Sequence, residues 1–351
     1  MALLSLTLLA ACNAPPRAKA VTRQGGQLLL DGQPYRFKGL NIYNANSRDN
    51  CSYNMQADHV LDASLNDIGP RSQNAFRAWF YQELASTRNG ARDWSAFDHT
   101  LAEAAAHNQR VVVTLADQWG DCETAPGSPG TYKDQAWYES GYKRDRPPGL
   151  RNTYRDWVQQ VVTRYKTSPA ILAWQLMNEA EDAESLHGPC ALTAAATLKA
   201  WASDMAHLVK SLDQRHLVSI GTIGGGQCGT TGTEYQSLHD LPDVDLCEYH
   251  DYGNPRVAIP GDAQNGLQVR LDQCRALGKP LFIGEMGIER QAAGSLAQRA
   301  ALFDAKLAAQ AERGVAGWLL WAWADRSHAA APDDQFAIGP GDPTLRILNR
   351  Y

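Results

Sequence analysis

The segment Ile171-Leu-Ala-Trp-Gln-Leu-Met-Asn-Glu179 is an almost continuous apolar run that ends on an acid, and Pro280-Leu-Phe-Ile-Gly-Glu285 repeats this pattern further along the chain. Such short apolar runs are typical of parallel strands that are covered on both faces. A carboxylate that closes a buried strand is costly unless it is paired or takes part in chemistry. The two segments therefore predict a parallel sheet with functional acids at the ends of its strands.

Similar short β-rich runs alternate with amphipathic stretches along most of the chain. Eight strands that alternate with helices or helical turns predict a single-domain α/β fold, the (β/α)8 TIM barrel. A doubly wound sheet is the alternative, but its glycine fingerprint is missing after the first strand. Strands are expected at residues 37–43, 75–79, 110–115, 171–177, 217–221, 244–249, 280–284 and 317–323, and helices at residues 94–107, 154–165, 192–212 and 296–313.

The N-terminal residues carry a signal for export. The apolar run before Cys12 is too short to span a bilayer, and Leu9-Ala-Ala-Cys12 resembles the lipobox of bacterial lipoproteins, although neither Lys nor Arg precedes the run. We expect a signal peptide at residues 1–11, a lipid anchor on Cys12 and a tether at residues 12–26. The domain at residues 27–351 then begins with a short hairpin that turns at Asp31-Gly32. A ragged N-terminus with a chance cysteine is the alternative.

Composition limits the class of partner. The chain has 351 residues, 44% of them apolar, and a formal net charge of −5. This balance argues against nucleic acid, which requires a basic face. Ten tryptophans and thirteen tyrosines either fill the core or stack on the flat faces of sugars. We expect a monomer that contacts a membrane only through the lipid on Cys12.

Six cysteines remain when Cys12 is set aside, and an even number in an exported chain favours disulfides. Spacing alone leaves fifteen pairings open. Pairing of neighbours predicts Cys51–Cys122, Cys190–Cys228 and Cys247–Cys274. Neither a CxxC nor an HxxxH pair indicates a zinc site, so we expect no metal and no cofactor.

Glu179 and Glu285 fall at the ends of the fourth and seventh expected strands. The carboxyl ends of barrel strands converge on one face, where two carboxyl groups about 5–5.5 Å apart can cleave a glycosidic bond with retention of configuration. A salt bridge is the ordinary explanation for one such acid. Two of them, on strands that both end on the same face, favour a catalytic pair.

At these residues the sequence resembles clan A glycoside hydrolases, especially family 5, over residues 27–323. The resemblance rests on an ordered set rather than on one motif: Asn41 closes the first strand, Arg77 lies on the second, Asn178-Glu179 closes the fourth, His250 and Tyr252 follow the sixth, Glu285 closes the seventh and Trp321 lies on the eighth.

The resemblance implies that Glu285 is the nucleophile and Glu179 the acid/base. Arg77 and Tyr252 would hydrogen-bond Glu285, and Arg77 would favour its ionised form. The nearby charge of Glu285 would raise the pKa of Glu179, which has to carry a proton.

The remaining residues of the set would bind the sugar or support the acids. Asn178 would bind the sugar 2-hydroxyl, and Asn41 would support the site. His250 would hold the acid/base or the sugar, unless it is a core histidine satisfied by backbone. Trp321 would lie under the sugar beside the cleavage point, unless it only fills the barrel. Glu181 and Glu289 are interpreted as loop or helix acids, and Asp117 and Asp121 as solvated loop acids, with a sugar subsite near Trp119 as the alternative.

The expected substrate is a β-1,4-linked polysaccharide or its oligosaccharides. Many family 5 cellulases carry a histidine at the end of the third strand, where this chain has Val111-Val-Val-Thr-Leu-Ala-Asp-Gln-Trp119. That ending is more like the Asn-Trp of β-mannanases, and Trp119 would stack on a sugar near the cut. Residues 222–228 lack the Glu-Gly-Phe pattern of mannanases. We therefore predict an endo-β-1,4-mannanase, with an endoglucanase, a transglycosylase and a non-catalytic glycan-binding barrel as alternatives.

Overall fold

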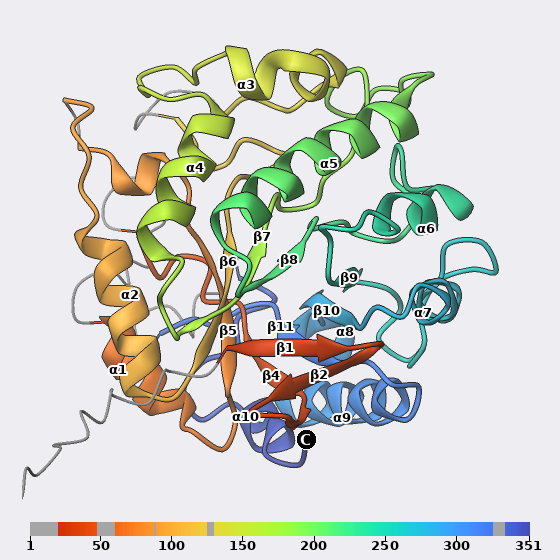
Figure 1. Ribbon diagram of the computed structural model, residues 1–351. Helices are drawn as coiled ribbons and strands as arrows, with labels where there is room; N and C mark the ends of the chain where they lie inside the picture. Colours follow the sequence, from red (N-terminus) through yellow and green to blue (C-terminus); the bar gives the residue numbers. More distant parts are fainter. Residues whose placement is uncertain (1–19, 48–59, 88, 125–129, 326–333) are drawn as a thin grey trace, which may run out of the picture.

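A computed structural model describes residues 20–47, 60–87, 89–124, 130–325 and 334–351. Parallel strands form its centre (Figure 1), in two sheets with the orders β5-β6-β7-β8 and β4-β11-β10-β9. Parallel bridges Asn41–Arg77 and Ser219–Leu246 join the two sheets at both edges, which closes the ring. The strands are β4 (Phe37–Leu40), β5 (Ala75–Trp79), β6 (Arg110–Thr114), β7 (Ile171–Gln175), β8 (Leu217–Ser219), β9 (Cys247–Asp251), β10 (Leu281–Met286) and β11 (Gly317–Leu320).

All eight expected strands are present, and several are buried on both faces, as their apolar runs predict. Most end earlier than expected, because the last residues of each run bend into the loops that carry the site. β5 ends as expected, and β9 and β10 extend further, to Asp251 and Met286, so His250 and Glu285 lie within their strands.

Helices surround the strands (Figure 1) because each presents one apolar face to the barrel. The side chain of Thr153 caps α4 by accepting a hydrogen bond from the backbone N–H of Asp156 at 3.1 Å. The helices are α1 (Val60–Ile68), α2 (Ser95–Ala106), α3 (Tyr142–Arg144), α4 (Tyr154–Tyr165), α5 (Ala194–Leu212), α6 (Thr233–His239), α7 (Leu267–Ala276), α8 (Arg290–Ala293), α9 (Leu296–Glu312) and α10 (Pro343–Leu348), with single turns η1 (Glu83–Ala85) and η2 (Trp137–Gly141). Among the described residues, none of the helices combines the length and apolar composition that a bilayer crossing requires.

A small antiparallel sheet precedes the barrel. It contains β1 (Val21–Gln24), β2 (Gln27–Leu30) and β3 (Gln33–Tyr35). The expected hairpin turns at Asp31-Gly32 between β2 and β3, but β1 adds a strand from residues that we assigned to the tether. Its Val21 packs with Leu28 in a cluster that includes residues of the first halves of barrel strands, such as Phe282. The small sheet therefore covers the amino-terminal end of the barrel, opposite the site.

Two disulfides, one between loops and one between β9 and α7, form as the cysteine order predicts. Cys190 pairs with Cys228 and Cys247 pairs with Cys274. Cys122 is also disulfide-bonded, but its expected partner Cys51 lies outside the described residues, as does Cys12.

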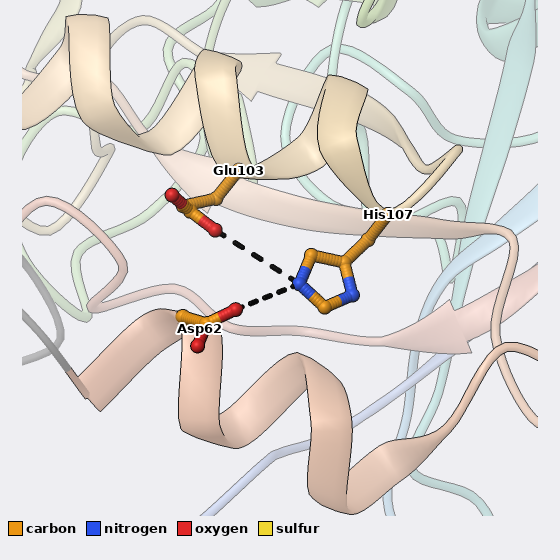
Figure 2. Close-up of side chains that lie close together, drawn as sticks. All are labelled: Asp62, Glu103 and His107. Atoms are coloured by element: carbon orange, nitrogen blue, oxygen red, sulfur yellow. Dashed lines mark hydrogen bonds and ion pairs between the residues drawn. The ribbon is translucent and has the colours of Figure 1, made fainter.

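Helices α1 and α2 are linked by a polar cluster on the surface. Figure 2 shows the His107 ring facing two carboxylates, with Nε2 2.9 Å from Asp62 Oδ1 and 3.9 Å from Glu103 Oε2. Because Asp62 is on α1 and Glu103 is on α2, the histidine bridges the two helices. More than half of the Asp62 side chain is exposed, so the interaction is screened by solvent and contributes at most about 1 kcal/mol.

Candidate active site

Arg77, on β5, lies at the centre of a hydrogen-bonded group at the carboxyl end of the barrel. Its guanidinium donates to four oxygens, and no part of the side chain is exposed. The acceptors are Glu285 Oε1 at 2.7 Å, Asn178 Oδ1 at 2.6 Å, Gln175 Oε1 at 2.8 Å and Asn41 Oδ1 at 2.9 Å. A planar donor fork of this kind fixes the direction of every side chain that it touches.

Glu285 lies near the end of β10 and is nearly fully buried. Besides the Arg77 ion pair, it accepts a hydrogen bond from the Tyr252 hydroxyl to Oε2 at 2.6 Å. Tyr252 is 42% exposed, so it reaches the carboxylate from the open side of the rim. Both predicted partners of Glu285 are therefore in contact with it, one at each carboxylate oxygen.

Glu179 follows β7 with a backbone φ of 60°, a left-handed conformation that is uncommon for a residue with a side chain. The carbonyl oxygen of Met177 leaves no room for a side chain at Gly221, because an added Cβ would lie 1.6 Å from that oxygen. Loops after β7 and β8 are therefore packed tightly together, and the amide N–H of Ala180 donates to the Gly221 carbonyl at 3.0 Å. This packing holds the turn that directs Glu179 into the site.

The side chain of Glu179 has two donors. His250 Nδ1 lies 2.8 Å from its Oε1, and the indole N–H of Trp119 donates to its Oε2 at 2.7 Å. Carboxylate oxygens of Glu179 and Glu285 and a ring nitrogen of His250 all lie within 4.8 Å of one another. The two acids, which are distant in sequence, are thus brought together on one face with a separation suited to a retaining glycosidase.

A third carboxylate, Glu248, lies below His250 and was missed from the sequence. It is on β9, two residues before His250, and is fully buried. Its oxygens accept hydrogen bonds from Gln175 Nε2 at 2.5 Å and Ser219 Oγ at 2.7 Å, and His250 Nε2 lies 3.2 Å from Oε1. Alternation along the strand could have identified it, because residues two apart point to the same face.

The carboxylates around His250 shift the pKa of His250, and His250 in turn shifts the pKa of Glu179. Burial alone would lower the pKa of His250, but the nearby carboxylates of Glu285, Glu179 and Glu248 raise it to about 10. Burial alone would raise the pKa of Glu179, but the hydrogen bond and the charge of His250 outweigh it and lower the pKa. The expectation that Glu285 would raise the pKa of Glu179 is therefore wrong for the free protein, because the imidazolium lies closer.

Asp117 is a further correction. It was interpreted as a solvated loop acid, but it is buried and its Oδ1 accepts a hydrogen bond from Asn178 Nδ2 at 2.7 Å. Burial raises the pKa of Asp117 to about 6 against the opposing effects of the Asn178 hydrogen bond and the Lys133 charge. With Arg77 on its oxygen and Asp117 on its nitrogen, the amide of Asn178 has a single orientation and one remaining N–H.

The other expected site residues differ in how far they are buried. Asn41 is fully buried and donates to the Gly284 carbonyl at 3.0 Å, so it supports Arg77 from beneath. Trp321 is half-buried, and its ring stacks on Tyr43 at 5.0 Å with an interplanar angle of 11°. Trp119 is also half-buried, with its ring 5.9 Å from that of Tyr132. Both tryptophans are therefore partly open to solvent, and Trp119 contacts Glu179.

Comparisons with known proteins agree with this geometry. The chain is 25% identical to mannan endo-1,4-β-mannosidase A of Podospora anserina, over 98% of this chain and 94% of the relative, and 26% identical to that of Hypocrea jecorina, over 93% and 77%. The endo-1,4-β-mannanase structure from Rhizomucor miehei superposes with a TM-score of 0.73 at 18% identity, covering 94% of this chain and 97% of that one. The family model for cellulase (glycosyl hydrolase family 5) matches residues 31–327. The chain therefore belongs to glycosyl hydrolase family 5 and is a glycoside hydrolase.

Proposed function

We propose that the protein is a retaining endo-β-1,4-mannanase in which Glu285 is the nucleophile and Glu179 the acid/base. The observation that carries the mechanism is the approach of the two carboxylates to within 4.8 Å. Inverting enzymes keep their carboxyl groups about 6.5–9.5 Å apart, because a water molecule has to fit between acid and base.

In the first step, a carboxylate oxygen of Glu285 forms a bond to the anomeric carbon while the bond to the leaving oxygen breaks. Arg77 and Tyr252 hold this carboxylate in place, so little reorganisation is needed when it attacks. A proton passes from Glu179 to the leaving oxygen. In the second step Glu179 takes a proton from water, and the oxygen of that water replaces Glu285 on the anomeric carbon.

The proton for the first step is shared between Glu179 and His250. The 2.8 Å hydrogen bond between them allows one proton to lie on the ring nitrogen in the free protein and on the carboxyl group when the sugar is bound. The two groups therefore titrate as a pair rather than as independent sites. A substrate that displaces solvent from Glu179 would favour the neutral carboxyl group.

Mannan or glucomannan is proposed over cellulose on two grounds. Two related proteins carry the name mannan endo-1,4-β-mannosidase over most of this chain. In addition, the third barrel strand leads to Trp119 without a histidine, and the indole N–H of Trp119 contacts the proposed acid. A ring in that position can stack on the sugar that leaves.

The substrate is tested with mannan, glucomannan, a soluble cellulose derivative and xylan, scored by new reducing ends. Mannan or glucomannan should be cleaved fastest, with a mixture of oligosaccharides from early times as endo action requires. Faster cleavage of the cellulose derivative would favour the endoglucanase alternative. New, longer products when an acceptor sugar is added would indicate transglycosylation, and binding without any cleavage would indicate a non-catalytic barrel.

A further inference from the structure

Glu248 has no part in the proposed bond changes, yet the barrel interior is arranged around it. Its carboxylate is fully buried and accepts from Gln175 and Ser219 on neighbouring strands. Gly284, on β10, leaves the space that it occupies, since an added Cβ there would lie 1.9 Å from Glu248 Oε1 and 2.9 Å from His250 Nε2. Burying a carboxylate costs free energy, which suggests that Glu248 has a function beneath the site.

Each of the two ring nitrogens of His250 faces a carboxylate. Nδ1 faces Glu179 at 2.8 Å and Nε2 faces Glu248 at 3.2 Å. A neutral imidazole has one N–H and one lone pair, so either nitrogen without a proton would oppose a carboxylate lone pair. While Glu179 and Glu248 are both ionised, only the imidazolium donates on both sides.

We propose that Glu248 is a positioning residue that acts through His250, holding the imidazolium so that the Glu179–His250 pair keeps its exchangeable proton into the alkaline range. The inference rests on the proposed role of Glu179 as the acid/base. Its carboxylate is fully buried against Gln175, Ser219 and His250, so its effect on the reaction passes through His250.

The charged groups around the ring support this assignment. Glu179 from the loop after β7, Glu285 from β10 at 3.7 Å from Nδ1, and Glu248 on β9 itself are the anions. Arg77 from β5 is the opposing cation, and it is itself paired with Glu285. The Tyr252 hydroxyl donates to the same carboxylate. Of the three anions, Glu248 is the one that the proposed reaction leaves unchanged, so it provides a constant charge through both steps.

The test is Glu248→Gln, which keeps the shape and the acceptor oxygen while removing the charge. The glutamine oxygen can still accept from Gln175 and His250, and its amide can donate to the Ser219 hydroxyl. An opposite charge at this range shifts a pKa by about 1–3 units. The alkaline limb of kcat/KM on mannan should therefore move to lower pH by about 1–3 units, because the pair loses its proton sooner.

Two readouts separate this effect from general damage. An aryl mannoside with a good leaving group needs little proton donation, so its kcat/KM at high pH should change much less than that of mannan. In ¹⁵N NMR of histidine-labelled protein, the His250 nitrogens, assigned with His250→Asn, should both be protonated in most molecules at pH 9 in the wild type. In the Glu248→Gln variant, one of them should be unprotonated in at least about half of the molecules at that pH.

Ser219→Ala is the matched control, since it removes a neutral donor to the same carboxylate and leaves the charges in place; its alkaline limb should stay or rise. An unmoved limb in Glu248→Gln, or equal losses on both substrates, would overturn the inference. Glu179→Ala distinguishes failure of this inference from failure of the proposed function. If kcat/KM of that variant falls equally on mannan and on the aryl mannoside, the acid/base assignment itself is wrong.

Discussion

Glu285 and Glu179 have different neighbours, and their removal should have different consequences. Glu285→Ala removes the attacking oxygen, so hydrolysis of mannan and of activated aryl mannosides should both be lost. Glu179→Ala removes proton donation, which should slow mannan cleavage roughly 10²–10⁴-fold while an activated aryl mannoside still forms the glycosyl-enzyme. Azide should then release that intermediate with retained configuration.

The anomeric configuration of the first product, followed by NMR, checks both assignments. The wild type should release a product of retained configuration, and azide acting on Glu285→Ala should give the inverted one. An inverted first product from the wild type would contradict both roles together, because the approach of the two acids to within 4.8 Å would then not be the catalytic arrangement.

Among the acids, Glu179 and Glu285 at strand ends could be predicted, whereas Glu248 within β9 and the buried position of Asp117 after β6 could not. Glu179 and Glu285 are recognisable because each closes an apolar run. Alternation along β9 places Glu248 on the same face as His250, but its role follows from its contact with His250, as that of Asp117 follows from its contact with Asn178. The contact of Asp117 with Asn178 joins side chains from different elements, and such neighbours do not share a sequence pattern.

Trp174 and Asp213 show how single contacts hold elements of the barrel together. Asp213 follows α5 and accepts hydrogen bonds from His216 Nδ1 at 2.6 Å and from the Trp174 indole on β7 at 2.8 Å. Burial opposes ionisation, but these donors outweigh it and lower the pKa of Asp213 to about 2. The link fixes where the chain leaves α5 and enters β8.

A depressed carboxyl pKa contributes stability that is complete above the unfolded value, near 4, and is lost as the pH falls to about 2. Asp213→Asn should therefore lower the free energy of unfolding by about 2 kcal/mol at pH 7. Urea unfolding of both proteins measures this difference, which should shrink progressively below about pH 4. A difference that stays constant down to pH 2.5 would show that the ionised carboxylate is not its source.

At the scale of the molecule, the leader remains a prediction. Cys12 lies outside the described residues, and the expectation of a lipid rests on Leu9-Ala-Ala-Cys12. Cys12→Ser, produced in a bacterial host that processes lipoproteins, should move the protein from the membrane fraction to the soluble fraction. Membrane association that persists in the variant, or mature protein that still begins with Met1, would contradict the anchor.

The sequence by itself determined the order of eight strands, four of the principal helices and the two acids at strand ends, because apolar period and strand-end chemistry are local properties of the chain. Only the tertiary structure decided that β1 extends the small sheet, that the His250 ring lies between three carboxylates, and that the pKa of Glu179 is lowered. These outcomes depend on distances between strands, and electrostatic energy in a buried site changes steeply with distance.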